Sequence, residues 1–197
     1  MQQRAIVTRR KILDSAIVSF AGTGFNGTTV DDIADNAGVN KQRIYAYFGS
    51  KRKLFEAALL EVFQRVKLIT NSTLEDAKRN PENLSSIVLT SFFDVHEKQP
   101  VLWRLLAWAN LEGGEYAQVL ESARKEENIG LKKIFDEAVS AKFIKPMKFE
   151  SWLFMLLGIS CFYHSNRHTL EFTLDSKLTE EKWKNELIDD VIKTFAP

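Results

Sequence analysis

The chain has a single cysteine, Cys161, and only four prolines among its 197 residues. One thiol cannot form a disulfide within the chain, and it cannot build a cysteine-cluster zinc site. No apolar run approaches the roughly 18 to 20 residues of a membrane-spanning helix, and the start of the chain lacks the apolar core of an export signal. We therefore expect a cytoplasmic protein with no membrane segment.

An excess of charge is also missing, because 27 basic and 26 acidic residues leave a net charge of +1. The charge is nevertheless unevenly distributed. Residues 1–53 contain nine Lys and Arg against four Asp, whereas the remainder is net acidic. Such asymmetry is typical of a segment that binds a polyanion, although a solvated basic face would give the same count.

No stretch alternates apolar and polar residues for long enough to indicate a strand, whereas apolar residues recur almost everywhere at helical spacing. We therefore predict an all-α fold of about nine helices, with an N-terminal domain at 1–50 and a larger helical domain at 51–197. The expected helices are a first one through Phe20, a short one that Thr28 and Thr29 cap and Gly38 ends, and others near 41–48, 51–79, 81–98, 100–112, 115–143, 148–169 and 179–195.

Residues 28–48 read as two short helices that meet at a glycine turn, which is a helix-turn-helix. Val30, Ile33 and Phe48 are among the apolar residues that can pack between the two helices. Basic, amide and aromatic residues then face outward from the second helix. A helix fits the major groove of DNA, and its N-terminal side chains reach the base edges. A purely structural hairpin would not need such a face, so the pattern predicts DNA binding.

The segment from about residue 5 to 60 resembles the DNA-binding domain of the TetR family of bacterial transcriptional regulators. The resemblance is carried by R-R-K-I-L-D-S-A-I-V-S-F, T-T-V-D-D-I-A-D-N-A-G-V, I-Y-A-Y-F-G-S-K and L-F-E-A-A. It implies a phosphate contact from Thr28 or Thr29. The other DNA-binding residues that it implies are Asn40, Lys41, Gln42 and Arg43 at the start of the second helix, Tyr45 and Tyr47 along it, and Lys51 on a phosphate.

One part of this reading helix departs from the family pattern. The family often has Gly followed by Thr or Ser after the lysine, whereas this chain has Gln42 and Arg43. A glutamine favours adenine and an arginine favours guanine, so we expect an unusual operator sequence. Arg4, Arg9 and Arg10 precede this region, and the sequence leaves open whether they contact DNA or form a disordered arm.

One recognition helix covers few base pairs, so we expect a homodimer that reads a palindromic operator in double-stranded DNA. The dimer surface that we predict uses two helices, which would form a four-helix bundle with their symmetry mates; the resemblance implies the same placement. Its residues are Trp152, Leu156, Ile159, Phe162 and Tyr163 on one helix, and Trp183, Leu187 and Val191 on the other. A core within one chain is the alternative.

The larger domain is rich in aromatic residues, and the resemblance suggests that a small-molecule effector binds among them. Our candidate ligand contacts are Phe92, Trp103, Trp108 and Phe135. Few charged residues lie near them, which favours an apolar or weakly polar effector. Core packing is the alternative for each of these aromatic residues.

Two further patterns are set aside. The G-x-G-x-x-G of residues 22–27 follows a helix and no strand, so it indicates a turn and not a dinucleotide site. Cys161, His164 and His168 share roughly one helix face, but packing explains them better than a metal site. We expect no metal, no cofactor and no enzymatic activity.

The whole sequence therefore predicts a DNA-binding transcriptional regulator that is released from its operator by an effector; repression is an expectation from the resemblance. Two alternatives stay open. One is a constitutive or architectural DNA-binding protein without an effector, and the other is an enzyme with an incidental helix-turn-helix.

Overall fold

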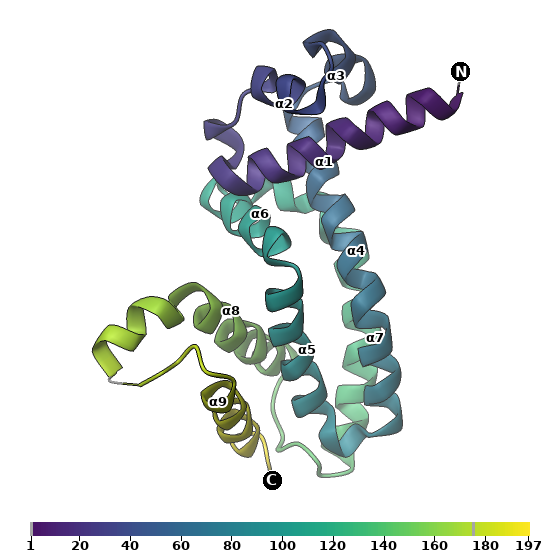
Figure 1. Ribbon diagram of the computed structural model, residues 1–197. Coiled ribbons are helices and arrows are strands. Elements are labelled where there is room, and N and C mark those ends of the chain that lie inside the picture. The colour runs from purple at the N-terminus through teal and green to yellow at the C-terminus, as the bar shows by residue number, and fades with distance from the viewer. Residues whose placement is uncertain (1, 175) are drawn as a thin grey trace. The chain divides into compact units, whose positions relative to one another are not determined.

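The computed structural model describes residues 2–174 and 176–197, and these contain nine α-helices, two 3-10 turns and no strand (Figure 1). The elements are α1 Gln2–Gly27, α2 Val30–Ala37, α3 Lys41–Phe48, α4 Lys51–Arg79, η1 Pro81–Asn83, α5 Leu84–Lys98, α6 Pro100–Leu111, η2 Glu115–Leu120, α7 Glu121–Ser140, α8 Phe149–Leu174 and α9 Glu181–Lys193. The predicted all-α fold is confirmed.

The largest differences from the predicted helix boundaries are in α1, before α7 and at the end of α8. Helix α1 continues to Gly27, although its backbone kinks at Gly24. The helix expected from residue 115 begins as the 3-10 turn η2, and α8 extends to Leu174. Pro81 and Pro100 each stand at the start of a helical element, where the missing N–H costs nothing.

The backbone packs into two compact units, which we call unit 1 (residues 1–67 and 99–124) and unit 2 (residues 68–98 and 125–197). Helix α4 contributes to both, and α6 belongs to unit 1 although it follows α5 in sequence. The domain boundary predicted at residue 50 stays a prediction, since these units are defined by backbone packing and divide the chain elsewhere.

Unit 1 packs α1 against both α2 and α6. Phe20 and Phe55 are fully buried, with an edge-to-face arrangement of rings whose centroids lie 4.9 Å apart. The kink at Gly24 permits a close approach by α6. Its φ of +73° disfavours other residues, and a Cβ there would lie 2.6 Å from Cε3 of Trp108. This glycine therefore fixes where α6 docks on α1.

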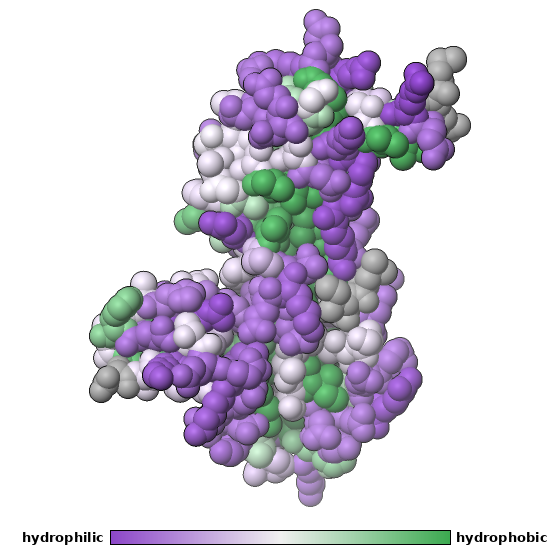
Figure 2. All heavy atoms as spheres, in the orientation of Figure 1, coloured by the Kyte–Doolittle hydropathy of each residue, from purple (hydrophilic) through white to green (hydrophobic). Residues whose placement is uncertain are grey.

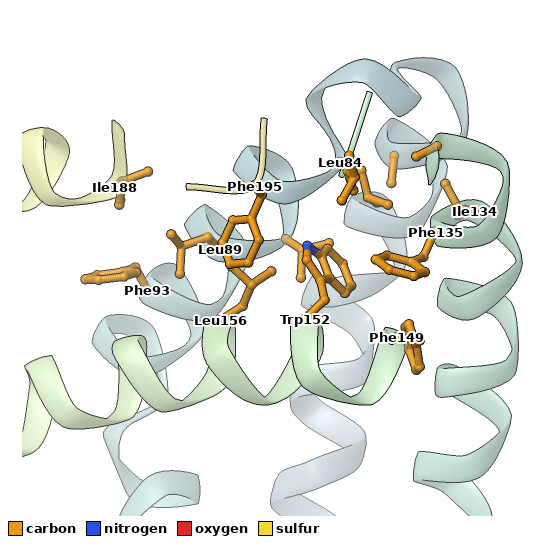
Figure 3. Close-up of a cluster of buried hydrophobic side chains, with 14 of the residues drawn as sticks. Leu84, Leu89, Phe93, Ile134, Phe135, Phe149, Trp152, Leu156, Ile188 and Phe195 are labelled. Atoms are coloured by element: carbon orange, nitrogen blue, oxygen red, sulfur yellow. The ribbon is translucent and has the colours of Figure 1, made fainter. Parts of the chain in front are cut away.

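Unit 2 has its own core, to which α5, α7, α8 and α9 contribute (Figure 3). Figure 3 shows the indole of Trp152 beside Phe135, with Leu156 one turn further along α8. The Trp152 and Phe135 ring centroids are 5.0 Å apart, and the buried indole N–H donates to Ser85 Oγ at 3.0 Å. Truncating a residue in this position would open a large cavity.

Candidate nucleic-acid interface

The turn between α2 and α3 is determined by local chemistry. Thr29 caps α2, because its hydroxyl accepts from the Asp32 N–H while the Asp32 carboxylate accepts from the Thr29 N–H. Gly38 ends α2 in the left-handed conformation, with φ 65°. Asn40 Oδ1 then accepts from the Arg43 N–H at 2.9 Å and starts α3. These three signals were read from the sequence, and each is confirmed.

Helix α3 separates an apolar side from a polar one. Ile44 and Phe48 are buried where α3 packs against α2, whereas Lys41, Gln42 and Arg43 are exposed. Tyr45 is also exposed and Tyr47 is half-buried. The residues predicted to contact bases therefore share one accessible surface at the start of a helix, which is the geometry that a major-groove reader needs. Their individual roles stay predictions.

The two candidate phosphate contacts at the start of α2 are placed differently. Thr28 is buried, its hydroxyl donates to the Gly24 carbonyl at 2.7 Å, and a second hydrogen bond joins it to Thr23. Thr29 is exposed at the helix N-terminus. Both hydroxyls have partners, since that of Thr29 bonds to Asp32, but only Thr29 is exposed, so it is the better placed of the two for a phosphate.

Two of the predicted DNA-binding cations have interactions within the chain, one with a carboxylate and the other with an aromatic ring. Lys41 Nζ lies 2.7 Å from Asp31 Oδ2, and this carboxylate raises the pKa of Lys41. Lys51 Nζ lies 4.5 Å above the Phe25 ring. Burial lowers the pKa of Lys51, and the nearby Glu112 opposes this shift only in part. The charge of Lys51 is thus partly shielded inside unit 1, and its contact with a phosphate stays a prediction.

Sequence reasoning missed the surroundings of Lys51. Tyr116 of η2 packs on Phe25 and Phe55, with ring centroids 4.8 and 5.1 Å apart. Arg52 lies over Tyr116 at 5.1 Å and pairs with Glu115 at 3.3 Å. We call Phe25, Phe55, Tyr116, Lys51 and Arg52 the cation–aromatic cluster. No local signal could find it, because its members come from segments about 25 to 90 residues apart.

Family models match both parts of this chain. The model described as "Bacterial regulatory proteins, tetR family" matches residues 12–58, and a "Tetracyclin repressor-like, C-terminal domain" matches residues 81–194. The chain belongs to the TetR family of bacterial regulatory proteins. It is a helix-turn-helix DNA-binding regulator, as the sequence predicted.

Relatives of this TetR-family regulator are named for transcriptional control. It is 30% identical over 186 residues to the HTH-type transcriptional repressor NicS of Pseudomonas putida, covering 92% of this chain and 87% of NicS. It is 30% identical over 88 residues to IcaR of Staphylococcus aureus, the negative transcriptional regulator of the biofilm operon icaADBC, covering 45% of this chain and 47% of IcaR.

Solved structures share the fold of the regulator. The crystal structure of HlyIIR, a hemolysin II transcriptional regulator, has a TM-score of 0.72 at 20% identity and covers 98% of this chain and 99% of its own. FadR from Bacillus subtilis, solved with stearoyl-CoA, has a TM-score of 0.66 at 20% identity, with 93% and 95% covered. At these identities the likeness concerns the fold alone.

The predicted dimer residues of the regulator divide by exposure. Trp152, Leu156 and Tyr163 are buried in the core of unit 2, so they offer no surface to a second chain while that core is intact. Ile159, Trp183, Leu187 and Val191 are partly buried against the same core. Phe162 alone of the eight is largely exposed, at 58%. The dimer prediction is not tested by a single chain.

The predicted ligand contacts lie in different units of the regulator. Trp103 and Trp108 belong to α6 in unit 1, whereas Phe92 and Phe135 belong to unit 2. Trp108 packs on Gly24, and Phe135 is buried against Phe149 and Trp152. Neither unit by itself forms a pocket from all four residues, and their role in binding an effector stays a prediction.

Two kinds of feature are absent from the described residues of the regulator, namely a helix suited to a membrane and a cluster of metal ligands. None of its helices, over the residues described, is both long and apolar enough to cross a membrane. Within the same residues, no three His, Cys, Asp or Glu side chains gather as a metal ion requires. His164 Nδ1 instead bonds to the Ser160 carbonyl at 2.9 Å, and burial raises the pKa of Cys161 to about 11.

Proposed function

We propose that this TetR-family regulator is a homodimeric repressor that binds a palindromic operator in the bacterial cytoplasm and leaves it when an effector binds. The carrying observation is the exposed start of α3, where Gln42 and Arg43 project beside an asparagine cap. Relatives named as repressors support the direction of control. We therefore propose that the chain acts as a regulator and not as an enzyme.

The proposed dimer uses the outward side of α8. Phe154 and Phe162 are two helical turns apart and are 77% and 58% exposed, with Gly158 between them. A Cβ at Gly158 would meet nothing within 4 Å, so this position leaves a notch that a partner helix can approach. Uncovered aromatic residues on one stripe favour association, and a second copy pairs such stripes isologously.

An effector that is apolar or weakly polar suits the aromatic composition of the chain. FadR from Bacillus subtilis, which shares the fold, was solved with stearoyl-CoA, a ligand with a long apolar chain. That observation concerns FadR, and for this chain it supports only a class of ligand to test first. A ligand that releases DNA must bind the free conformation more tightly than the DNA-bound one.

The test is selection of bound sequences from random duplex DNA by the purified protein at near-physiological salt, which suppresses non-specific phosphate binding. We expect an enriched palindrome with half-sites about one helical turn apart, or about 34 to 36 Å. Guanine and adenine should face Arg43 and Gln42. Selection is repeated after unfolding, stripping and refolding, to remove any co-purified effector; no enrichment in either preparation would refute the proposal.

A constitutive DNA-binding protein is the second candidate. The two are separated by thermal melting against a metabolite library, together with DNA release by each hit. A true effector raises the melting temperature with its concentration and lowers the affinity for the selected operator. Operator binding that no stabilising compound weakens would favour the constitutive alternative.

A further inference from the structure

A groove of about 780 Å³ lies between the start of α1 and the outer side of α3. Residues 3–5, Val7 and Thr8 line one wall, and Arg43, Ala46 and Tyr47 line the other. Figure 1 shows the N-terminal end of α1 projecting past α3 as a continuous helix. The recognition helix therefore has a neighbouring wall that belongs to the first turns of the chain. We call this feature the arm groove.

The basic residues near the arm groove are used in different ways. Arg9 lies over the Phe48 ring at 5.0 Å, and Arg10 pairs with Asp14 at 3.0 Å and with Glu61 at 2.7 Å. The side chains of Arg4 and Arg43, in contrast, have no ion pair or hydrogen bond with any described residue. These two free guanidinium groups stand on opposite walls of the groove.

The arm groove is suited to the outside of a DNA strand. No acidic side chain is among the described residues that line it, and the walls between the arginines include Val7 and Ala46. Ile6 and Val7 remain 64% and 50% exposed, and Figure 2 shows hydrophobic spheres near the N-terminal end of α1. A sugar–phosphate backbone offers a negative phosphate for the Arg4 guanidinium and apolar deoxyribose faces for the aliphatic side chains, while Arg43 stays available for a base edge.

We propose that the arm groove takes the sugar–phosphate backbone that flanks the bases read by α3, and that Arg4 binds a phosphate there. The proposal rests on the proposed function, and it assigns different roles to the three arginines. Arg4 contacts DNA, whereas Arg9 and Arg10 hold α1 to α3 and α4. Because α1 is already helical from Gln2, little conformational entropy is lost when DNA enters.

The test compares Arg4→Ala with Arg104→Ala, which removes the same charge from an exposed position on α6 of the same unit. Affinity for the selected operator and for an unrelated duplex is measured by fluorescence anisotropy over a range of salt concentrations. Arg4→Ala should weaken both by a similar factor, about three- to tenfold, and should reduce the salt slope by about one per chain. Arg104→Ala should leave the slope unchanged.

A hydroxyl-radical footprint gives the second readout. The Arg4→Ala protein should lose protection at the outer one or two nucleotides of each half-site, while the selected motif stays the same. Arg4→Lys should restore both the slope and the protection, since a lysine also neutralises a phosphate. Circular dichroism should be unchanged, because the Arg4 side chain has no partner in the described structure.

Three results would overturn the proposal. If Arg4→Ala changes neither the salt slope nor the footprint while the wild type binds its operator specifically, the arm groove does not bind DNA. If Val7→Ala abolishes the dimer and leaves the salt slope of DNA binding unchanged, the arm groove binds a second copy of the chain and not DNA. Failure of the wild-type protein to enrich any DNA would refute the proposed function itself, which a null result with Arg4 alone does not.

Discussion

Helices α3 and α8 both bury one side, but their exposed sides differ in chemistry. The exposed side of α3 carries Lys41, Gln42 and Arg43, whereas that of α8 carries Phe154 and Phe162. A polar and cationic side can stay in water until it meets phosphates and base edges. An aromatic side is stabilised by leaving water, so it favours a protein partner. The two surfaces are thus suited to different partners.

The largest expected effect is a difference in stability between substitutions on the buried and the exposed sides of α8. Trp152→Ala removes a fully buried indole and should lower the free energy of unfolding by about 3–5 kcal/mol at every protein concentration. Phe154→Ala, two residues along, changes an exposed side chain. It should lower the stability only at concentrations where the wild type is dimeric, because its contacts lie between chains. Urea unfolding at several concentrations measures both, and equal losses at high dilution would contradict this division.

Acid should destabilise unit 2 before unit 1, because the two histidines that folding shields from water, His96 and His164, belong to unit 2. Burial, with help from the neighbouring His164, lowers the pKa of His96 to about 4, and burial also lowers the pKa of His164. The unfolded chain therefore binds more protons between its ordinary histidine pKa of about 6.5 and the folded value.

Stability should consequently fall as the pH drops from about 7 to about 4, by about 3 kcal/mol for His96. Ser160 Oγ lies 2.6 Å from His96 Nδ1, and Glu97 Oε1 lies 4.0 Å from His164 Nε2. Lys184 pairs with Glu97 at 3.1 Å. The charges of Lys184 and Arg167 both disfavour a protonated His164, whereas that of Glu97 favours it. Urea titrations at several pH values test the slope. The double variant His96→Gln, His164→Gln should flatten it, and an unchanged slope would show that other groups are responsible.

A substitution on the exposed side of α3 should change the DNA sequence specificity of the protein and leave its free energy of unfolding unchanged. Arg43→Ala removes an exposed guanidinium and should cost about 1–3 kcal/mol of binding to the selected operator, or about fivefold to 150-fold in affinity. Competition binding with operators changed at one base pair at a time measures this. When the base pair that Arg43 contacts is changed, the variant and the wild type should bind with equal affinity, because the variant no longer prefers guanine there. Changes at the other base pairs should leave the difference in affinity as it is. An equal loss on unrelated duplex DNA would mean that Arg43 binds phosphate.

The smallest effect concerns the cation–aromatic cluster. Glu112 accepts a hydrogen bond from Asn26 and acts electrostatically on Lys51, so it competes with a DNA phosphate for that ammonium. Glu112→Gln keeps the acceptor and removes the charge. DNA affinity should rise by up to about threefold at low salt and converge with the wild type at high salt. Glu186→Gln, which removes a charge in unit 2, is the control; a similar gain there would indicate only a change in net charge.

Prediction from sequence succeeded where the signals are local. The Thr29 capping box, the left-handed Gly38 and the Asn40 cap each involve residues within a few positions of one another, so the helix-turn-helix could be located from sequence alone. The spacing of Ile44 and Phe48 likewise indicated which side of α3 is buried.

The same reasoning could not decide which side of α8 faces inward. Apolar residues surround this helix, since Trp152 and Leu156 alternate with Phe154 and Phe162. A helix that is apolar on all sides has no periodic signal that separates its core from an interface. The predicted dimer set therefore included Trp152, Leu156 and Tyr163, which are buried within one chain. The cation–aromatic cluster was missed because its members are far apart in sequence.

The sequence by itself determined that the chain is helical, where its short helices begin and end, and that α3 displays a basic reading surface, because these properties depend on neighbouring residues. Only the tertiary structure decided that Trp152 is in the core while Phe154 is exposed, and that α6 docks on Gly24. It also showed that Arg9 and Arg10 are engaged, while the Arg4 side chain has no ion pair or hydrogen bond with any residue that the structure describes. Those outcomes depend on which segments, distant along the chain, exclude water from each other.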